Sequence, residues 1–226
     1  FGIIADDITC EWVDMSPAGD RTQIQKFNSP SESRRFLNHT PGLVKIVVDA
    51  LLDYSANSTL ATAYSEIAEN YGLMSCPPNI EVGYRRTILT FRFDSDEHLL
   101  AAAFLAIIPF NDALETQKNL MAICKIIESQ NLGKKRIVQL CKALNSARDN
   151  LNEVIKMLRI ALNPGQKIKF FQSPTQTILI SSGQETLTVN SHPSFGRRGA
   201  SSQESKFSLP IGQKVVDFLA SFDYVD

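Results

Sequence analysis

The chain has 226 residues, of which 43% are hydrophobic and 21% charged, and its formal net charge is −1. This composition is close to that of globular domains, and the length allows one large or two small domains with a sizeable core. No stretch approaches the ~20 apolar residues that a membrane-spanning helix needs, and no basic segment precedes an apolar run. We therefore expect an intracellular protein, cytoplasmic or nuclear, without a membrane span.

The beginning of the chain predicts a β-hairpin followed by a short helix. The β-prone residues 7–15 and 21–27 flank the turn-forming residues 17–20, which is the pattern of a hairpin. The sequence Ser29-Pro30-Ser31-Glu32 then fits a capping box with proline at the first helical position. We expect this helix to end at Leu37.

The next segments predict three helices and one extended stretch. Residues 43–54 place apolar side chains on one broad stripe, and residues 59–71 repeat this helical pattern more weakly. Residues 80–93 alternate with a period of two, which predicts a strand or a long hairpin arm. Residues 95–108 are apolar on almost every side, so we expect a buried helix there.

The middle of the chain predicts two amphipathic helices joined by a short turn, which favours an antiparallel helical hairpin. The first spans residues 112–130. In the second, apolar residues between 137 and 161 alternate at spacings of three and four, which gives four successive a/d pairs of a heptad. This heptad seam either packs inside the protein or forms a helix interface. The candidate interface residues are Ile137, Leu140, Leu144, Leu151, Val154 and Leu158.

The last part of the chain predicts more antiparallel strands and a final helix. Residues 166–172, 175–181 and 184–190 read as three strands of a meander, with turn residues between them. Residues 191–208 are rich in serine and glycine and predict a loop. Residues 210–222 return to an amphipathic helical pattern.

Together these elements predict an α+β fold. It combines a helical hairpin, containing a long heptad-patterned helix, with antiparallel β-hairpin and meander segments. We expect a single domain over residues 1–226. A possible subdivision lies near residue 77 or residue 164, where prolines interrupt the predicted elements.

The charges are unevenly distributed along the chain. Residues 1–132 carry 10 Lys and Arg against 17 Asp and Glu, a net charge of −7, whereas residues 133–226 carry 13 against 7, a net charge of +6. The basic segment, residues 134–169, could be a solvated helix face, a contact for an acidic partner surface, or a contact for a phosphate backbone. Arg85 and Arg86 would extend such a surface. The candidate contact residues are Lys134, Lys135, Lys142, Lys156, Arg159, Lys167 and Lys169.

Motifs for catalysis or cofactor binding are nearly absent from the sequence. There is no phosphate-binding loop and no serine nucleophile elbow, and the three histidines lie too far apart for a local zinc-ligand spacing. We expect no catalytic residue, no cofactor and no bound metal. The cysteines are Cys10, Cys76, Cys124 and Cys141. We expect them to be reduced, with the last two on apolar helix faces.

The leading functional hypothesis is a non-catalytic assembly or adaptor protein, or a subunit of a larger complex, that acts through protein–protein interaction or self-association. A first alternative is a nucleic-acid-binding component of a nucleoprotein assembly that uses the basic segment 134–169. A second alternative is an enzyme whose site assembles only in three dimensions, around the paired carboxylates of Asp6 and Asp7.

Overall fold

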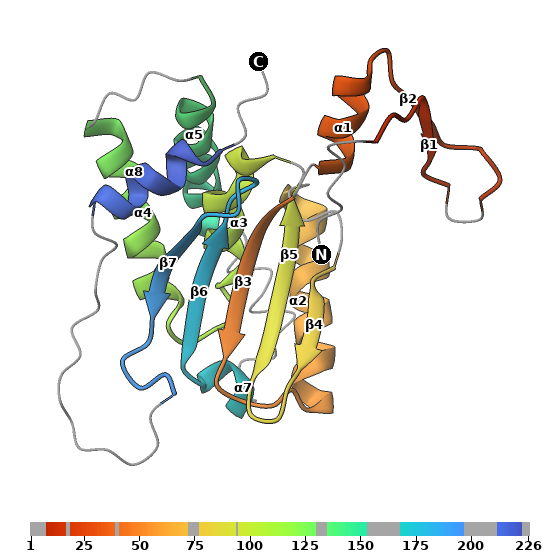
Figure 1. The fold of residues 1–226 in the computed structure, drawn as a ribbon. Helices are drawn as coiled ribbons and strands as arrows, with labels where there is room; N and C mark the ends of the chain where they lie inside the picture. Colours follow the sequence, from red (N-terminus) through yellow and green to blue (C-terminus); the bar gives the residue numbers. More distant parts are fainter. Residues whose placement is uncertain are drawn as a thin grey trace. The chain divides into compact units, whose positions relative to one another are not determined.

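The computed structural model describes residues 8–16, 19–38, 41–71, 77–93, 95–129, 135–152, 168–196 and 212–222 (Figure 1). The chain divides into two compact units, residues 1–40 and 41–226, and each is described by itself. The expected subdivision points, residues 77 and 164, both fall within the second unit. Helices combine with antiparallel strands, which confirms the predicted α+β class.

The first unit contains the predicted hairpin and helix. Strand β1 (Trp12–Asp14) pairs antiparallel with β2 (Ile24–Lys26). Helix α1 (Pro30–Asn38) follows them. The Oγ of Ser29 accepts the amide of Glu32 at 3.2 Å, so the predicted cap forms at the start of the helix.

The second unit is built on an antiparallel sheet of five strands in the order β4-β5-β3-β6-β7 (Figure 1). The strands predicted at residues 175–181 and 184–190 are confirmed. The extended stretch predicted at residues 80–93 forms two paired strands with a turn between them. The strands are β3 (Gly42–Val48), β4 (Asn79–Val82), β5 (Thr87–Phe93), β6 (Thr175–Ile180) and β7 (Thr186–Ser191).

The helix predicted at residues 43–54 is wrong, because residues 42–48 form the central strand β3. The segment is rich in valine and isoleucine, whose branched side chains favour strands. Val44, Ile46 and Val48 alternate with their neighbours and are 0% exposed. β3 pairs with β5 on one side and β6 on the other, and this long-range pairing overrides the helical spacing of the apolar residues.

The strand predicted at residues 166–172 is also wrong over its described part, because residues 169–172 form the short helix α7 (Lys169–Gln172). Phe170 and Phe171 are both buried, and both rings pack against Phe110, with centroid separations of 5.9 and 5.6 Å. Successive side chains of a strand point to opposite faces. Two adjacent phenylalanines that pack against the same ring therefore fit a helical turn better.

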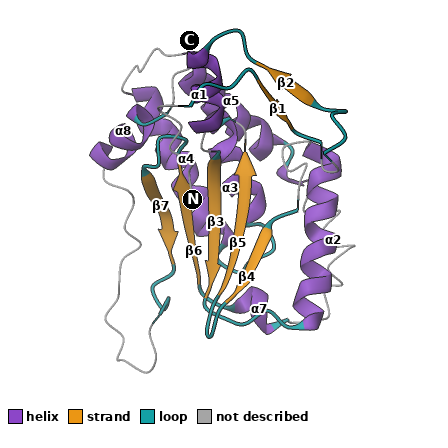
Figure 2. Cartoon of the chain, turned by 45° about the vertical axis from the view of Figure 1, so that its right-hand side comes forward, coloured by secondary structure: helices purple, strands orange, loops and turns teal. Residues whose placement is uncertain are grey.

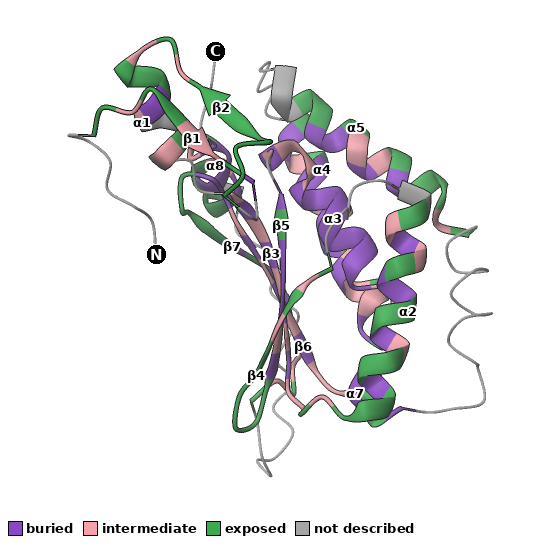
Figure 3. Cartoon of the chain, turned by 90° about the vertical axis from the view of Figure 1, so that its right-hand side faces the viewer, coloured by how far each residue is buried: buried purple, intermediate pink, exposed green. Residues whose placement is uncertain are grey.

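Helices cover one face of the sheet, as Figure 3 shows with the sheet seen nearly edge-on. The eight residues of α3 are all buried, as predicted. None of the helices within the described ranges is long and apolar enough to cross a bilayer. The helices of this unit, besides α7, are α2 (Tyr54–Tyr71), the short 3-10 helix η1 (Asp96–His98), α3 (Leu99–Ala106), α4 (Ala113–Ser129), α5 (Lys135–Asp149) and α8 (Gly212–Ala220).

The described residues do not show the predicted long helix with the heptad pattern. α5 ends at Asp149, a turn follows at Asn150, and residues 153–167 lie outside the described part of the chain. Leu140 and Leu144 of the predicted seam are 1% and 0% exposed and belong to the hydrophobic core of the second unit. Over the described residues, the seam therefore packs within this chain.

Candidate functional site

One end of the sheet brings together four segments that are distant in the sequence. β3 ends there, the β4–β5 turn projects there, and α7 lies there just before β6 begins (Figure 2). The segment after β7 reaches the same end, where it contacts the residue that follows β3. We call this surface the hairpin end. It comprises residues 49–54, 82–86, 169–174 and 192–196.

Asp49 connects these segments through three hydrogen bonds. Its Oδ1 accepts the Nε of Arg86 at 3.3 Å, and its Oδ2 accepts the amide of Gly196 at 3.0 Å. Its own amide donates to the carbonyl of Pro174 at 2.9 Å. The β4–β5 turn, the segment after β7 and the start of β6 are therefore all held by one residue.

Arg86 is held from a second side by an aromatic ring. Its guanidinium lies 4.6 Å from the ring centroid of Phe195, a cation–π contact. Gly196, the next residue, has a φ of 72°, and a Cβ added there would lie 2.9 Å from the Nη2 of Arg86. The positive φ favours glycine at this position, and a larger residue would also displace the end of the Arg86 side chain.

Exposed apolar and aromatic side chains gather at the hairpin end. Tyr84 is 88% exposed, and the guanidinium of Arg85 lies 5.3 Å from its ring centroid. Val82 is 56% exposed, Leu51 53% and Tyr54 90%. Only six large hydrophobic side chains are exposed in the described part of the second unit, and four of them lie here.

A hollow of about 610 Å³ lies against the β4–β5 turn. Its lining mixes the carboxylates of Asp49 and Glu81 with the guanidinium groups of Arg85 and Arg86. This volume is within the usual range of ligand pockets. Charged residues of both signs lie beside Val82, Tyr84 and Ile88 in its lining, so the hollow can take a partner side chain that has both an apolar and a polar part.

The structure describes the side chains of two of the predicted basic contact residues. Lys142 on α5 and Lys169 on α7 are both exposed. α5 lies towards one end of the sheet and α7 at the hairpin end (Figures 1 and 3), so these two lysines are not brought together. Lys135 belongs to α5, but its side chain is outside the described set. The remaining candidates, Lys134, Lys156, Arg159 and Lys167, lie outside the described residues.

The remaining predicted site residues are those of the helix interface and the acidic pair Asp6 and Asp7. Of the predicted helix interface, Leu140 and Leu144 lie in the core, and Leu151 is partly buried against it. Ile137 lies in α5 without a described side chain, and Val154 and Leu158 lie outside the described residues. Asp6 and Asp7 also lie outside them, so the enzyme alternative stays a prediction without a described site.

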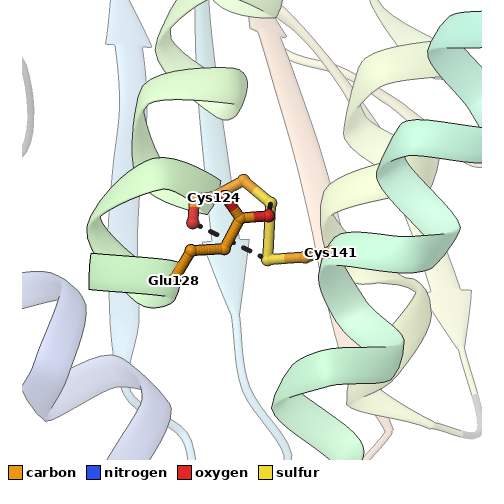
Figure 4. Close-up of side chains that lie close together, drawn as sticks. All are labelled: Cys124, Glu128 and Cys141. Carbon is orange, nitrogen blue, oxygen red and sulfur yellow. Dashed lines mark hydrogen bonds between the residues drawn. A yellow bond between two sulfur atoms is a disulfide. The ribbon is translucent and has the colours of Figure 1, made fainter. Parts of the chain in front are cut away.

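The prediction that the cysteines are reduced is wrong for one pair. Cys124 on α4 and Cys141 on α5, which we expected to be reduced, form a disulfide (Figure 4). Their Cα atoms are 5.6 Å apart, within the range that a disulfide spans. The carboxylate of Glu128, one helical turn after Cys124, lies 3.7 Å from the Cys124 sulfur. Cys10 has a free thiol, and Cys76 lies outside the described residues.

The sequence analysis named Arg85 and Arg86 but missed the roles of Asp49, Tyr84 and Phe195. Residues 80–93 alternate throughout, and Gly83 within this stretch was the available signal for a turn. Nothing in the sequence near Asp49 indicates its contact with Gly196, 147 residues later.

Comparisons with protein-family models, with curated proteins and with solved structures found no match to this chain.

Proposed function

We propose that this chain is a non-catalytic interaction protein, an adaptor or a subunit of a larger complex, and that it binds a partner protein through the hairpin end. The observation that carries this proposal is the exposure of Tyr84 beside Arg85, with Leu51, Tyr54 and Val82 on the same end of the sheet. Tyrosine and arginine are enriched among the residues that dominate binding energy at protein interfaces.

The exposed side chains offer a substantial gain on binding. Fully burying one large apolar side chain contributes about 1.5–3 kcal/mol. Tyr54 and Tyr84 present large surfaces with few rotatable bonds, so little conformational entropy is lost when a partner covers them. Arg85 adds a cation that can pair with an acidic group of the partner while its guanidinium stays against Tyr84.

The scaffold under these side chains is already ordered, which lowers the entropic cost of binding. The amide of Gly83 donates to the carbonyl of Arg86 at 2.8 Å and closes the turn. The Oγ1 of Thr87 donates to the carbonyl of Ala50 at 2.9 Å and ties β5 to the segment that carries Leu51. The Asp49–Arg86 ion pair adds a further connection.

The test compares Tyr84→Ala with a control, Val138→Ala. Val138 is 47% exposed but lies on α5, towards the opposite end of the sheet from the hairpin end. Sedimentation velocity over a range of concentrations measures self-association, and affinity purification from cells that express the chain identifies other partners. With the purified partner or the self-associating chain, we expect Tyr84→Ala to weaken binding about 30-fold, as for a hot-spot residue.

Val138→Ala should leave the affinity unchanged. Equal affinities for the unsubstituted chain and Tyr84→Ala would contradict the proposal. Circular dichroism of each variant checks that the fold is retained, and Tyr54→Ala gives a second reading of the same surface.

A second candidate is binding of single-stranded nucleic acid at the same end. Lys169, the last residue of the basic segment, is exposed on α7 at the hairpin end, together with Arg85 and the exposed ring of Tyr84. Cations that contact phosphates, with an aromatic ring on which a base stacks, are the usual chemistry of single-strand binding.

Fluorescence anisotropy with labelled single-stranded RNA and DNA, at low and near-physiological salt, tests this candidate. We expect Tyr84→Ala to weaken binding of all sequences and Lys169→Glu to flatten its salt dependence. Lys142→Glu on α5 is the control and should change neither. No binding at low salt would exclude this candidate and leave the protein partner.

A further inference from the structure

Cys124, Glu128 and Cys141 form a cluster on the facing sides of α4 and α5 (Figure 4). The two sulfur atoms and one carboxylate oxygen all lie within 4.8 Å of one another. Cys124 and Cys141 are 2% and 5% exposed, whereas Glu128 is exposed to solvent. The cluster therefore has a buried sulfur side and an open carboxylate side.

The spacing between the Cys124 sulfur and the Glu128 carboxylate matches the coordination sphere of zinc. Zinc binds thiolates at about 2.3 Å and carboxylates at about 2.0–2.2 Å, so two such ligands on one tetrahedral ion lie roughly 3.6 Å apart. The Cys124 sulfur and the Oε1 of Glu128 are 3.7 Å apart. Positions 124 and 128 lie on the same face of α4, one turn apart. Cys141 reaches the same point from α5.

We propose that, once the disulfide is reduced, this cluster binds one thiophilic divalent cation, with Zn²⁺ as the fitting ion. The thiolates of Cys124 and Cys141 and the carboxylate of Glu128 are three ligands, and a water molecule on the exposed side is the fourth. Thiolates favour zinc over the hard cations Mg²⁺ and Ca²⁺. The site is independent of the hairpin end and of the function proposed for it.

The disulfide must be reduced before the two sulfur atoms can bind a metal ion. A dithiol reductant gives two electrons and two protons to the Cys124–Cys141 disulfide, which becomes two thiols, while the reductant becomes a disulfide. Zn²⁺ then replaces the two thiol protons, which pass to solvent. Because the same sulfur atoms form either the disulfide or the metal bonds, the oxidised chain cannot use them to bind the ion.

The measurement uses the full chain with Cys10→Ser and Cys76→Ser, so that the pair holds the only thiols. The chain is reduced under anaerobic conditions, and Co²⁺ is added as a spectroscopic probe and then displaced by Zn²⁺. We expect one equivalent of Co²⁺ with thiolate charge-transfer bands and the visible bands of a tetrahedral ion. The oxidised chain, identified by its intact mass, should give none of these bands.

Glu128→Gln tests the carboxylate with little risk to folding, because this side chain is exposed. We expect it to weaken Zn²⁺ binding at least tenfold, roughly the lower limit for losing even a supporting group of a zinc site. Glu115→Gln, on the same helix, is the control and should leave the affinity unchanged. A reduced chain that binds no Co²⁺ or Zn²⁺, or an affinity unaffected by Glu128→Gln, would overturn the proposal.

Discussion

Arg86 donates from its Nε to the Oδ1 of Asp49 at 3.3 Å, although the two residues are 37 positions apart. The other oxygen of the same carboxylate accepts the amide of Gly196, a residue much further along the chain. The ion pair is therefore the point at which the end of β3, the β4–β5 turn and the segment after β7 are joined.

We expect Asp49→Ala to lower the free energy of unfolding by only about 1 kcal/mol, because Arg86 is 47% exposed and exposed ion pairs contribute little. The same change should weaken partner binding at the hairpin end, since the turn that carries Tyr84 loses its support. Urea unfolding and the binding assay measure the two effects. Glu115→Ala, which breaks the Glu115–Lys118 pair on α4, is the control and should leave binding intact.

Gly183→Ala should destabilise the second unit. A Cβ at this position in the β6–β7 turn would overlap the carbonyl oxygen of Ser221, so the backbone has to move. Overpacking of this kind costs about 1–3 kcal/mol. At Gly83, by contrast, the nearest atom is 3.4 Å away, and Gly83→Ala should cost less. Differential scanning calorimetry of both variants tests the comparison, which equal melting temperatures would contradict.

Leu144→Ala should destabilise the chain by about 2–5 kcal/mol without changing its oligomeric state, because Leu144 is fully buried in the core. Val138→Ala, also on α5 but with a side chain 47% exposed, should change stability by less than about 0.5 kcal/mol. Urea unfolding and light scattering measure the two properties. A Leu144→Ala variant that dissociates an oligomer at unchanged stability would show that the seam is an interface instead.

Tyr64 should make the protein sensitive to alkali. Its hydroxyl donates to the carbonyl of Ala106 at 2.8 Å, and burial raises the pKa of the phenol above its usual 10.0. A group whose folded pKa is raised contributes stability that is complete below the unfolded pKa and is lost as the pH rises beyond it. Stability should therefore fall above about pH 10.

Tyr64→Phe removes this titration, so its stability should change less between about pH 8 and about pH 11 than that of the unsubstituted chain. At neutral pH the variant should be less stable by about 1 kcal/mol, because the hydrogen bond to Ala106 is lost. Urea midpoints at both pH values give the comparison. An identical alkaline loss in both proteins would mean that another group is responsible.

The elements that the sequence predicted correctly are those with a local signal. The capping residues before α1, the amphipathic stripe of α4 and the alternation in β6 and β7 each specify structure within a few residues. Residues 43–48 have a helical spacing and an alternating spacing at once. Their pairing with β5 and β6 decides between the two, and a single segment does not contain that information.

The residues of the hairpin end could be predicted even less well, because contacts between distant segments bring them together. Arg85 and Arg86 were identified as a basic pair, but the sequence contains no sign that Asp49 neutralises one of them and leaves the other against Tyr84. The disulfide was missed for a related reason. Cys124 and Cys141 lie on separate helices, and each alone has the pattern of a small hydrophobic residue.

The position of β3 in the middle of the sheet has a consequence for synthesis on the ribosome. β5 can pair with β3 as soon as it emerges, but β6, the other neighbour of β3, begins only at Thr175. At usual translation rates, the chain between Phe93 and Thr175 takes about 4–16 s to make. During that interval the open side of β3 is a template to which other nascent chains can pair. A codon change that slows translation across this stretch would lengthen the exposure and favour aggregation, whereas a chaperone bound near the exit tunnel would counteract it.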